Sequence, residues 1–499
     1  MLRVVSHPLG PLPPIAPRQD TWRAELDGAL VATPGAEPAF QRLHRPGALV
    51  VTTGQQPGLF TGPLYAVHKA LAAAALARVL ERRWQRPVVP LFWLAGDDHD
   101  YTEASTAAWT DANGALVDWT LPPRAASAPQ LPMSAELLPA EAIAALEQLE
   151  AALPPGPPRD ETLAWLRRHY VAGATMHSAY SGALAELVAP FGVLCFDPTM
   201  LPAKRAQIPI LTAALRQAPA LDAALGALPD AGTGIAAGEG ATLVFVTTSV
   251  GRDRVLIDGD GFRTRRSGER FTARQIEALL EKDPSRFSAN VLLRPVVESA
   301  LLPTVAYVAG PGEMRYLERQ VATLYPLLGV TRQTPVPRWS GTIVARSAER
   351  LLGRLHVTAD AVMGDDGTLA RSFLERAMPG DARQAIEALR GQIGRSAGVI
   401  NVAGKRIDPV LDRAIKGRMD RLRQVTDDIE AVILRHLKRR DDIAYAQFIR
   451  LSEGLRPHGK PQERVLTSAS FLGRYGNVWL NSLFEVISAW AEAVPTDTA

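Results

Sequence analysis

Three apolar runs constrain the fold of this chain more than any other feature. They span residues 48–52, 87–95 and 304–309, and a glycine follows each within two residues. Uninterrupted apolar runs of this length are typical of strands that are covered on both faces, as in a parallel sheet. The segment 64–83, which is rich in alanine and has helix-forming composition, separates the first two runs. Strand, loop, helix and strand form a βαβ unit, so the sequence predicts an open α/β core.

The length of 499 residues allows two to four domains, at about 150 residues per domain. Apolar residues make up 47% and charged residues 21%, which are proportions typical of a folded globular chain and not of a disordered one. We expect a core over 1–340 with insertions at about 115–160 and 232–285, a helical arm over 341–455, and a segment over 456–499 that returns to the core.

Two helical patterns flank Asp408 and Pro409 between about residues 381 and 452. Apolar side chains recur there at spacings that are mostly three and four. They are Ile386, Leu389, Ile393, Ala397 and Ile400 in the first pattern and Leu411, Ile415, Met419, Leu422, Val425, Ile429, Ile433 and Leu437 in the second. This spacing predicts an antiparallel helical hairpin with a coiled-coil seam. We expect the hairpin to form a homodimer; packing of the hairpin on its own core is the alternative.

Charge and cysteine content exclude several classes of protein. The net charge is only +3, and the basic residues are spread along the chain, so no nucleic-acid partner is expected. Cys195 is the only cysteine, which excludes an intrachain disulfide, and its apolar surroundings predict a buried structural thiol. No apolar stretch approaches the roughly 18 residues of a membrane span, and the first residues lack the layout of a signal peptide. We therefore expect a cytoplasmic protein.

The first candidate site is the loop between the first strand and its helix. Glycines there permit positive φ and let backbone amides face an anion at the start of a helix. The loop has neither the Gly-Lys-Ser/Thr ending of a Walker A motif nor the GxGxxG pattern. We interpret His68 and Lys69 as contacts for phosphate or carboxylate, with a solvated helix pair as the alternative. The candidate residues of this segment are Gly54, Gln55, Gln56, Phe60, Gly62, Tyr65, His68 and Lys69.

The second candidate site is the run of Asp97, Asp98, His99 and Asp100, which follows the second apolar strand. Ligands bind at the carboxyl ends of strands in open α/β sheets. Three carboxylates and an imidazole suit amine binding, general base catalysis or a divalent metal. Adjacent residues point in different directions, so we predict no metal site. We take Asp98, His99 and Asp100, together with His68 of the first cluster, as catalytic candidates. A capping or turn cluster is the alternative.

The third candidate site again follows a strand. Gly310 begins a glycine turn, and Glu313 and Tyr316 lie one helical turn apart just after it. We expect this cluster and the aspartate cluster to face one crevice. Asn290 and Arg294 are predicted to join it, although a structural salt bridge is an equal alternative for Arg294.

Several segments of this chain resemble the cysteine-adding enzymes of bacillithiol biosynthesis. The resemblance rests on residues 53–56, 59–65, 68–69, 98–100, 287–290, 294–295, 310–313 and 459–465, in the family's order and over nearly the whole chain. It implies a Rossmann-like core similar to nucleotidylyltransferases and class I synthetases. It also implies connecting insertions and a coiled-coil arm used for dimerisation.

The resemblance further implies a ligase that forms an amide bond between L-cysteine and the amino group of glucosaminyl-malate, the last step of bacillithiol biosynthesis. Amide formation from a free carboxylate needs activation, so we expect ATP as cosubstrate together with Mg²⁺. Lys460 and Arg464 are predicted to form a separate anion or nucleotide site. Two alternatives stay open, namely a metal-dependent hydrolase built on Asp97–Asp100 and a non-catalytic coiled-coil scaffold.

Overall fold

The computed structural model describes residues 2–7, 9–229, 240–365, 368–376, 378–440 and 442–495. It divides into two compact units. One unit combines Leu2–Ile343 with Gln462–Ala499, and the other is Val344–Pro461. Among the described residues, no helix has both the length and the apolar character needed to cross a membrane.

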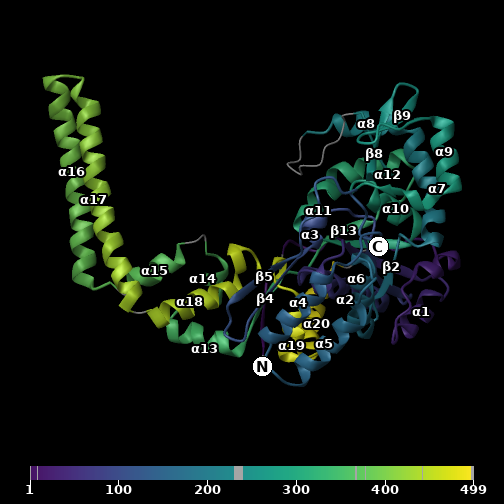
Figure 1. Ribbon diagram of the computed structural model, residues 1–499, viewed down its shortest axis with the longest axis horizontal. Coiled ribbons are helices and arrows are strands. Elements are labelled where there is room, and N and C mark those ends of the chain that lie inside the picture. Colours follow the sequence, from purple (N-terminus) through teal and green to yellow (C-terminus); the bar gives the residue numbers. More distant parts are fainter. Residues whose placement is uncertain are drawn as a thin grey trace. The chain divides into compact units, whose positions relative to one another are not determined.

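A five-stranded parallel sheet forms the centre of the first unit (Figure 1). Its strands in spatial order are β13 (Thr334–Pro337), β12 (Thr304–Ala309), β2 (Leu49–Gln55), β3 (Val88–Leu94) and β6 (Leu194–Phe196). All neighbouring pairs are parallel. The open α/β core expected from the apolar runs is therefore confirmed, and so is the Rossmann-like core that the resemblance implies.

Both faces of the sheet are buried, which explains why its strands lack polar alternation. Leu49 and Val51 belong to a cluster on one face, whereas Val50 belongs to a cluster on the other. Successive side chains of a strand point to opposite faces, so a strand between two cores needs apolar residues throughout. Cys195 in β6 is buried as predicted, and burial raises the pKa of its thiol above the ordinary value.

Helices of the first unit cover the sheet. The alanine-rich helix α2 (Tyr65–Trp84) packs on β2 and β3 and on α20 (Val478–Ala491), which brings the end of the chain onto the core. Other helices of this unit are α1 (Glu37–Leu43), α6 (Met176–Val188), α7 (Leu201–Arg216), α8 (Ala218–Gly226), α9 (Ala273–Lys282), α10 (Arg294–Leu301), α11 (Pro311–Tyr316), α12 (Ala322–Leu327) and α19 (Ser468–Tyr475). Small alanine side chains on α2 allow close packing on several sides.

The order of the strands defines a crevice. From β2 the chain passes through α2 to β3 on one side, whereas β12 pairs with the other side of β2 and is followed by β13. The connections therefore leave β2 and β12 in opposite directions. Ligands of open α/β sheets bind at such a switch point, outside the carboxyl ends of the strands.

Two insertions interrupt the sheet. The first, between β3 and β6, contains the hairpin of β4 (Thr106–Thr110) and β5 (Leu116–Thr120) and the helices α4 (Ala140–Ala152) and α5 (Pro157–His169). The second forms an antiparallel sheet of β10 (Arg270–Thr272), β9 (Gly261–Thr264), β8 (Gly251–Asp258), β7 (Ala241–Thr248) and β11 (Phe287–Ala289). A turn with Gly259 and Asp260 joins β8 to β9. Residues 232–239 of the expected insertion lie outside the described residues.

The second unit is helical. Its elements are α13 (Arg346–Leu355), α14 (Ala359–Met363), α15 (Leu369–Arg376), α16 (Gly380–Ile407), α17 (Leu411–Arg440) and α18 (Asp442–Leu455). The hairpin of α16 and α17 confirms the predicted pair of helices around Asp408 and Pro409 (Figure 1). Ile386 and Leu437 are buried in its seam. Other apolar residues of the predicted seam are 42–49% exposed, namely Leu389, Ile400, Leu422, Val425 and Ile429.

Gly96 follows β3 and packs closely against the buried imidazole of His177. We therefore expect a larger side chain at this position to destabilise the fold. A Cβ atom at position 96 would lie 2.6 Å from Nδ1 of His177, whose Nε2 is 2.8 Å from Asp197. We expect Gly96→Ala to lower the free energy of unfolding by about 1–3 kcal/mol, because the ring has to move out of its packed position. Chemical denaturation measures this change.

A double-mutant cycle tests the cause. If the clash with the imidazole is responsible, Gly96→Ala costs less in a His177→Ala background than in the wild type. Gly353→Ala, at a helical position with open space around the new methyl group, is the matched control and is expected to be neutral or stabilising. Equal losses for Gly96→Ala in both backgrounds would contradict the packing argument.

Candidate active site

A cavity of about 470 Å³ lies at the carboxyl ends of β2, β3 and β12, in the crevice defined by the strand order. This volume is in the range of small-molecule sites. Predicted site residues that line it are Gly54, Gln55, Gln56, Tyr65, Lys69, Asp98, His99, Asn290, Arg294, Gly310, Glu313, Tyr316 and Arg464. The structure thus brings all three candidate clusters and one residue of the C-terminal segment to a single cavity.

Four other predicted residues lie elsewhere. Phe60 is fully buried among aromatic rings, and Gly62 has a φ of 69° at the end of the loop before α2. Asp100 caps the short helix α3 (Tyr101–Ala104) by accepting a hydrogen bond from its backbone. Lys460 is exposed and belongs to the helical unit. These four residues are close in the sequence to residues that line the cavity, but they do not line it themselves.

His68 also lies outside the lining, in a buried polar network below it. Its Nδ1 is 2.9 Å from Oε2 of Glu463, whose Oε1 accepts hydrogen bonds from Arg338 at 2.5 Å and from Ser340 at 2.8 Å. Burial lowers the pKa of His68. Burial alone would raise the pKa of Glu463, but the contacts with His68 and Arg338 hold it well below its usual range. His68 thus helps to hold Arg338, which lines the cavity.

Lys69 and Glu313 join two of the loops at one end of the cavity. The Lys69 ammonium group donates to the carbonyl of Gly54 at 2.9 Å and to Oε1 of Gln55 at 3.2 Å, and it forms an ion pair with Glu313. Glu313 also accepts from the backbone N–H of Gly310 at 2.7 Å. An ammonium group has three hydrogens, and all three are engaged. Lys69 is therefore a buried structural cation as well as a lining residue.

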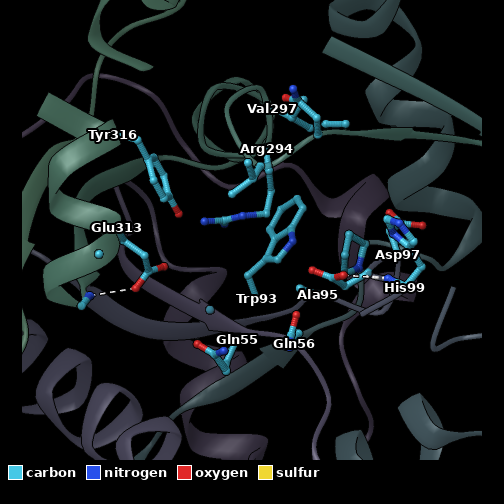
Figure 2. A pocket seen from close by; sticks show the side chains of 18 of the residues that line it. Gln55, Gln56, Trp93, Ala95, Asp97, His99, Arg294, Val297, Glu313 and Tyr316 are labelled. Atoms are coloured by element: carbon cyan, nitrogen blue, oxygen red, sulfur yellow. Dashed lines mark hydrogen bonds between the residues drawn. The ribbon is translucent and has the colours of Figure 1, made fainter. Parts of the chain in front are cut away.

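Arg294 lies between the two ends of the cavity, beside Trp93 (Figure 2). Its guanidinium group pairs with Glu298 at 3.0 Å and donates to the hydroxyl of Tyr307 at 2.8 Å. Burial raises the pKa of Glu298 to about 7, although Arg294 opposes the shift. The salt bridge weighed for Arg294 is present, and the same side chain also lines the cavity.

Asp97 at the other end is held by a lysine that the sequence analysis missed. The ammonium group of Lys204, on α7, donates to Oδ1 and Oδ2 of Asp97 at 2.7 and 2.9 Å and to the carbonyl of Phe287 at 2.7 Å. Both oxygens of Asp97 therefore already accept a hydrogen bond from a buried cation. Within the described part of the chain, no group of three or more histidine, cysteine, aspartate or glutamate side chains is arranged to hold a metal ion.

Asp98 differs from its neighbours because one of its oxygens is available. Its Oδ1 accepts hydrogen bonds from the backbone N–H groups of His99 at 2.7 Å and Asp100 at 3.0 Å. Its Oδ2 has no hydrogen-bond partner among the described residues. Since Asp98 lines the cavity, this carboxylate can bind an amine or accept a proton from a bound molecule.

The antiparallel insertion supplies two further arginines that the sequence analysis did not select. Arg252 and Arg254 on β8 line the cavity, and both guanidinium groups lie near the ring of Phe245, at 4.1 and 5.5 Å from its centroid. The spacing of two between these arginines was the available signal, because residues two apart on a strand share a face. Within the described residues, Arg252 is buried without a carboxylate at ion-pair distance. Buried charges require compensation, so this position suits an anionic ligand.

The ends of the cavity differ in chemistry. Glu313 and Tyr316 lie on one side, and Asp97 and His99 lie on the other, with Trp93 and Arg294 between them (Figure 2). The lining contains more cationic than anionic side chains: Lys69, Arg252, Arg254, Arg294, Arg338 and Arg464 against Asp97, Asp98 and Glu313. An excess of cationic groups attracts anionic substrates.

Comparisons with known proteins agree with this architecture. The family model for the bacillithiol biosynthesis protein BshC, N-terminal Rossmann-like domain, matches residues 28–339. The model for its C-terminal coiled-coil domain matches residues 341–492. The two matches together extend over nearly the whole chain.

Curated relatives carry the same family name, "Putative cysteine ligase BshC". The relative from Heliobacterium modesticaldum is 30% identical over 98% of this chain and 90% of its own length. Those from Solibacter usitatus and Chlorobaculum tepidum are 30% and 28% identical, each over 91% of this chain and over 85% and 83% of their own lengths. The chain therefore belongs to the BshC family of bacillithiol biosynthesis.

Proposed function

We propose that this protein is a ligase that adds L-cysteine to the amino group of glucosaminyl-malate and consumes ATP. Its relatives are named as cysteine ligases of the same family. The identities of the acceptor and of the cosubstrate come from the resemblance noted in the sequence, and the cavity provides chemistry that fits them.

One observation carries the proposal: within the described residues, a carboxylate oxygen that accepts no hydrogen bond and two cationic groups that form no ion pair line the same cavity. Asp98 is the carboxylate, and Arg252 and Arg464 are the cations. Neither arginine forms an ion pair within the described residues. Joining an amine to a carboxylate needs a group that receives the amine and its proton, and groups that bind the anionic partner.

The proposed reaction has two steps. The cysteine carboxylate attacks a phosphorus atom of ATP, and the acyl-adenylate forms with loss of pyrophosphate, or the acyl-phosphate with loss of ADP. The amine nitrogen of the acceptor then attacks the acyl carbon, a C–N bond forms, and AMP or phosphate leaves. The nitrogen loses its proton to Asp98. Phosphates carry several negative charges, so Arg252 and Arg464 are the groups available to them, with Mg²⁺ entering as the ion bound to ATP.

The geometry favours this proposal over a metal-dependent hydrolase built on Asp97–Asp100. Lys204 takes both oxygens of Asp97, and Asp100 caps a helix. Among the described residues, Asp98 is the one of these three carboxylates that lines the cavity with an oxygen that accepts no hydrogen bond. A carboxylate of this kind suits proton transfer, whereas a metal site needs several converging ligands.

We also propose that the hairpin of α16 and α17 mediates a homodimer. Its apolar residues Leu389, Ile400, Leu422, Val425 and Ile429 are 42–49% exposed in the single chain. Exposed apolar groups that recur along both helices of a hairpin are typical of association surfaces. A second copy of the hairpin is the occupant with the matching apolar surface.

The activity prediction is a direct test of the ligase. Purified protein incubated with glucosaminyl-malate, cysteine and Mg-ATP is expected to form the cysteinyl amide, with one AMP or ADP released per product. Mass spectrometry and nucleotide chromatography of the same samples measure both. Omitting either cysteine or the acceptor is expected to abolish product formation. Product formed without nucleotide turnover would contradict the role of ATP, and no product would contradict the proposed reaction.

The role of Asp98 has a matched control two residues away. We expect Asp98→Asn to lower kcat/KM by about 100- to 10,000-fold, because an amide cannot accept the proton of the attacking amine. The fold should persist, since the new amide oxygen can still accept from the backbone. Asp100→Asn preserves a good helix cap and is expected to lower kcat/KM far less. Equal losses in steady-state assays of the two variants would show that Asp98 has no special role.

The dimer prediction concerns the hairpin alone. Sedimentation velocity is expected to give a dimer for the wild type at micromolar concentration and a monomer for Leu422→Gln combined with Val425→Gln, because both changes remove apolar contact area. Val478→Gln, at a 71% exposed position on α20, is the control and should stay dimeric. A monomeric wild type would disprove the proposal.

A further inference from the structure

We propose that Arg252 fixes the tautomer of His99, so that His99 serves the bound substrate as a neutral hydrogen-bond donor through Nε2 and not as the base. This inference rests on the proposed ligase function for the identity of the substrate. It assigns a positioning role to Arg252 and a substrate-binding role to His99.

The contact between the two side chains determines where the imidazole proton lies. Nη1 of Arg252 is 3.0 Å from Nδ1 of His99. A guanidinium group has only donors, and it stays charged in proteins. Nδ1 therefore accepts, and a neutral imidazole with an acceptor at Nδ1 carries its hydrogen on Nε2. A proton on Nδ1 would place two N–H groups against each other.

Arg252 is held firmly enough to impose this choice. Its Nε donates to the hydroxyl of Ser288 at 2.9 Å, and its Nη2 donates to the carbonyl of Ala289 at 2.7 Å. Its guanidinium carbon also lies 4.1 Å from the centroid of the Phe245 ring. The arginine comes from β8, and its two hydrogen-bond partners come from β11, which lies on the other side of β7 in the same sheet. The antiparallel insertion therefore presents the guanidinium group to the end of β3 as a fixed unit.

Charges around His99 favour the neutral ring. Burial and the guanidinium groups of Arg252 and Arg124 lower the pKa of His99, and the carboxylates of Asp98 and Asp100 act in the opposite direction. The net direction is downward, which favours the neutral ring. Its Nε2 has no hydrogen-bond partner within the described residues, while the side chain lines the cavity.

The consequence for the reaction is a division of roles at this end of the cavity. Nε2–H can donate to an oxygen of the substrate that carries negative charge, next to Arg252, which forms no ion pair within the described part of the chain. The same ring cannot take a proton at Nε2, because that nitrogen already carries one. Proton acceptance is left to Asp98, whose Oδ2 accepts no hydrogen bond from the described residues.

Direct detection of the ring protons tests the tautomer without any activity assay. Long-range ¹H–¹⁵N NMR of protein labelled with ¹⁵N-histidine distinguishes protonated from unprotonated ring nitrogens, and His99→Gln identifies the signals of His99. We expect a neutral ring with its proton on Nε2 between pH 6 and 8 in the wild type, and a higher pKa with mixed tautomers in Arg252→Met. His436→Gln, at an exposed position on α17, is the control that leaves the His99 signals in place. A proton on Nδ1, or a protonated ring at pH 7, in the wild type would overturn the inference.

Kinetics then test the role. Glutamine keeps an N–H donor but cannot act as a base. We expect His99→Ala to lower kcat/KM by about 10- to 100-fold. The loss in His99→Gln is expected to be about tenfold smaller than the loss in His99→Ala. Equal losses in both variants, together with loss of the acidic limb of the pH profile, would identify His99 as the base and overturn the inference. A wild type without ligase activity would refute the proposed function, while the NMR result still decides the tautomer.

Discussion

The buried carboxylate of Glu463 is the interaction on which the cavity depends most. It accepts hydrogen bonds from Arg338 and Ser340 and contacts His68, so it joins the C-terminal segment to the segment after β13 and to α2. A buried charge is costly unless it is paired and hydrogen-bonded. The network therefore requires the end of the chain to return to the core, and it holds Arg338 at the cavity.

The same principle explains which cations are available to ligands. Lys69, Lys204 and Arg294 are satisfied by Glu313, Asp97 and Glu298, and these pairs fix the loops that follow the strands. Arg252 and Arg464 lack such partners within the described residues. A ligand with negative charge can compensate these two arginines directly. To bind Lys69, Lys204 or Arg294 instead, it would have to break an existing ion pair.

The antiparallel insertion supplies part of the cavity lining that the parallel sheet alone would not provide. Without β7 and β8, the carboxyl ends of β2, β3 and β12 would offer a cavity without Phe245, Arg252 and Arg254. The insertion closes one end of it, and its arginine contacts His99 at the end of β3. Two ends with different chemistry suit a reaction that joins two different substrates.

The sequence by itself determined the local elements and much of the site. Uninterrupted apolar runs predicted the parallel strands, helical spacing predicted the hairpin, and glycine loops after strands located Gln55, Asp98 and Glu313, because parallel strands bring their carboxyl ends to one edge. The tertiary structure alone decided which side chains are free. Asp97 is held by Lys204, which lies more than a hundred residues away in the chain, and His68 is held by Glu463. Such pairing depends on distances between segments that local patterns do not encode, and it separates a charged residue that binds a ligand from one that stabilises the fold.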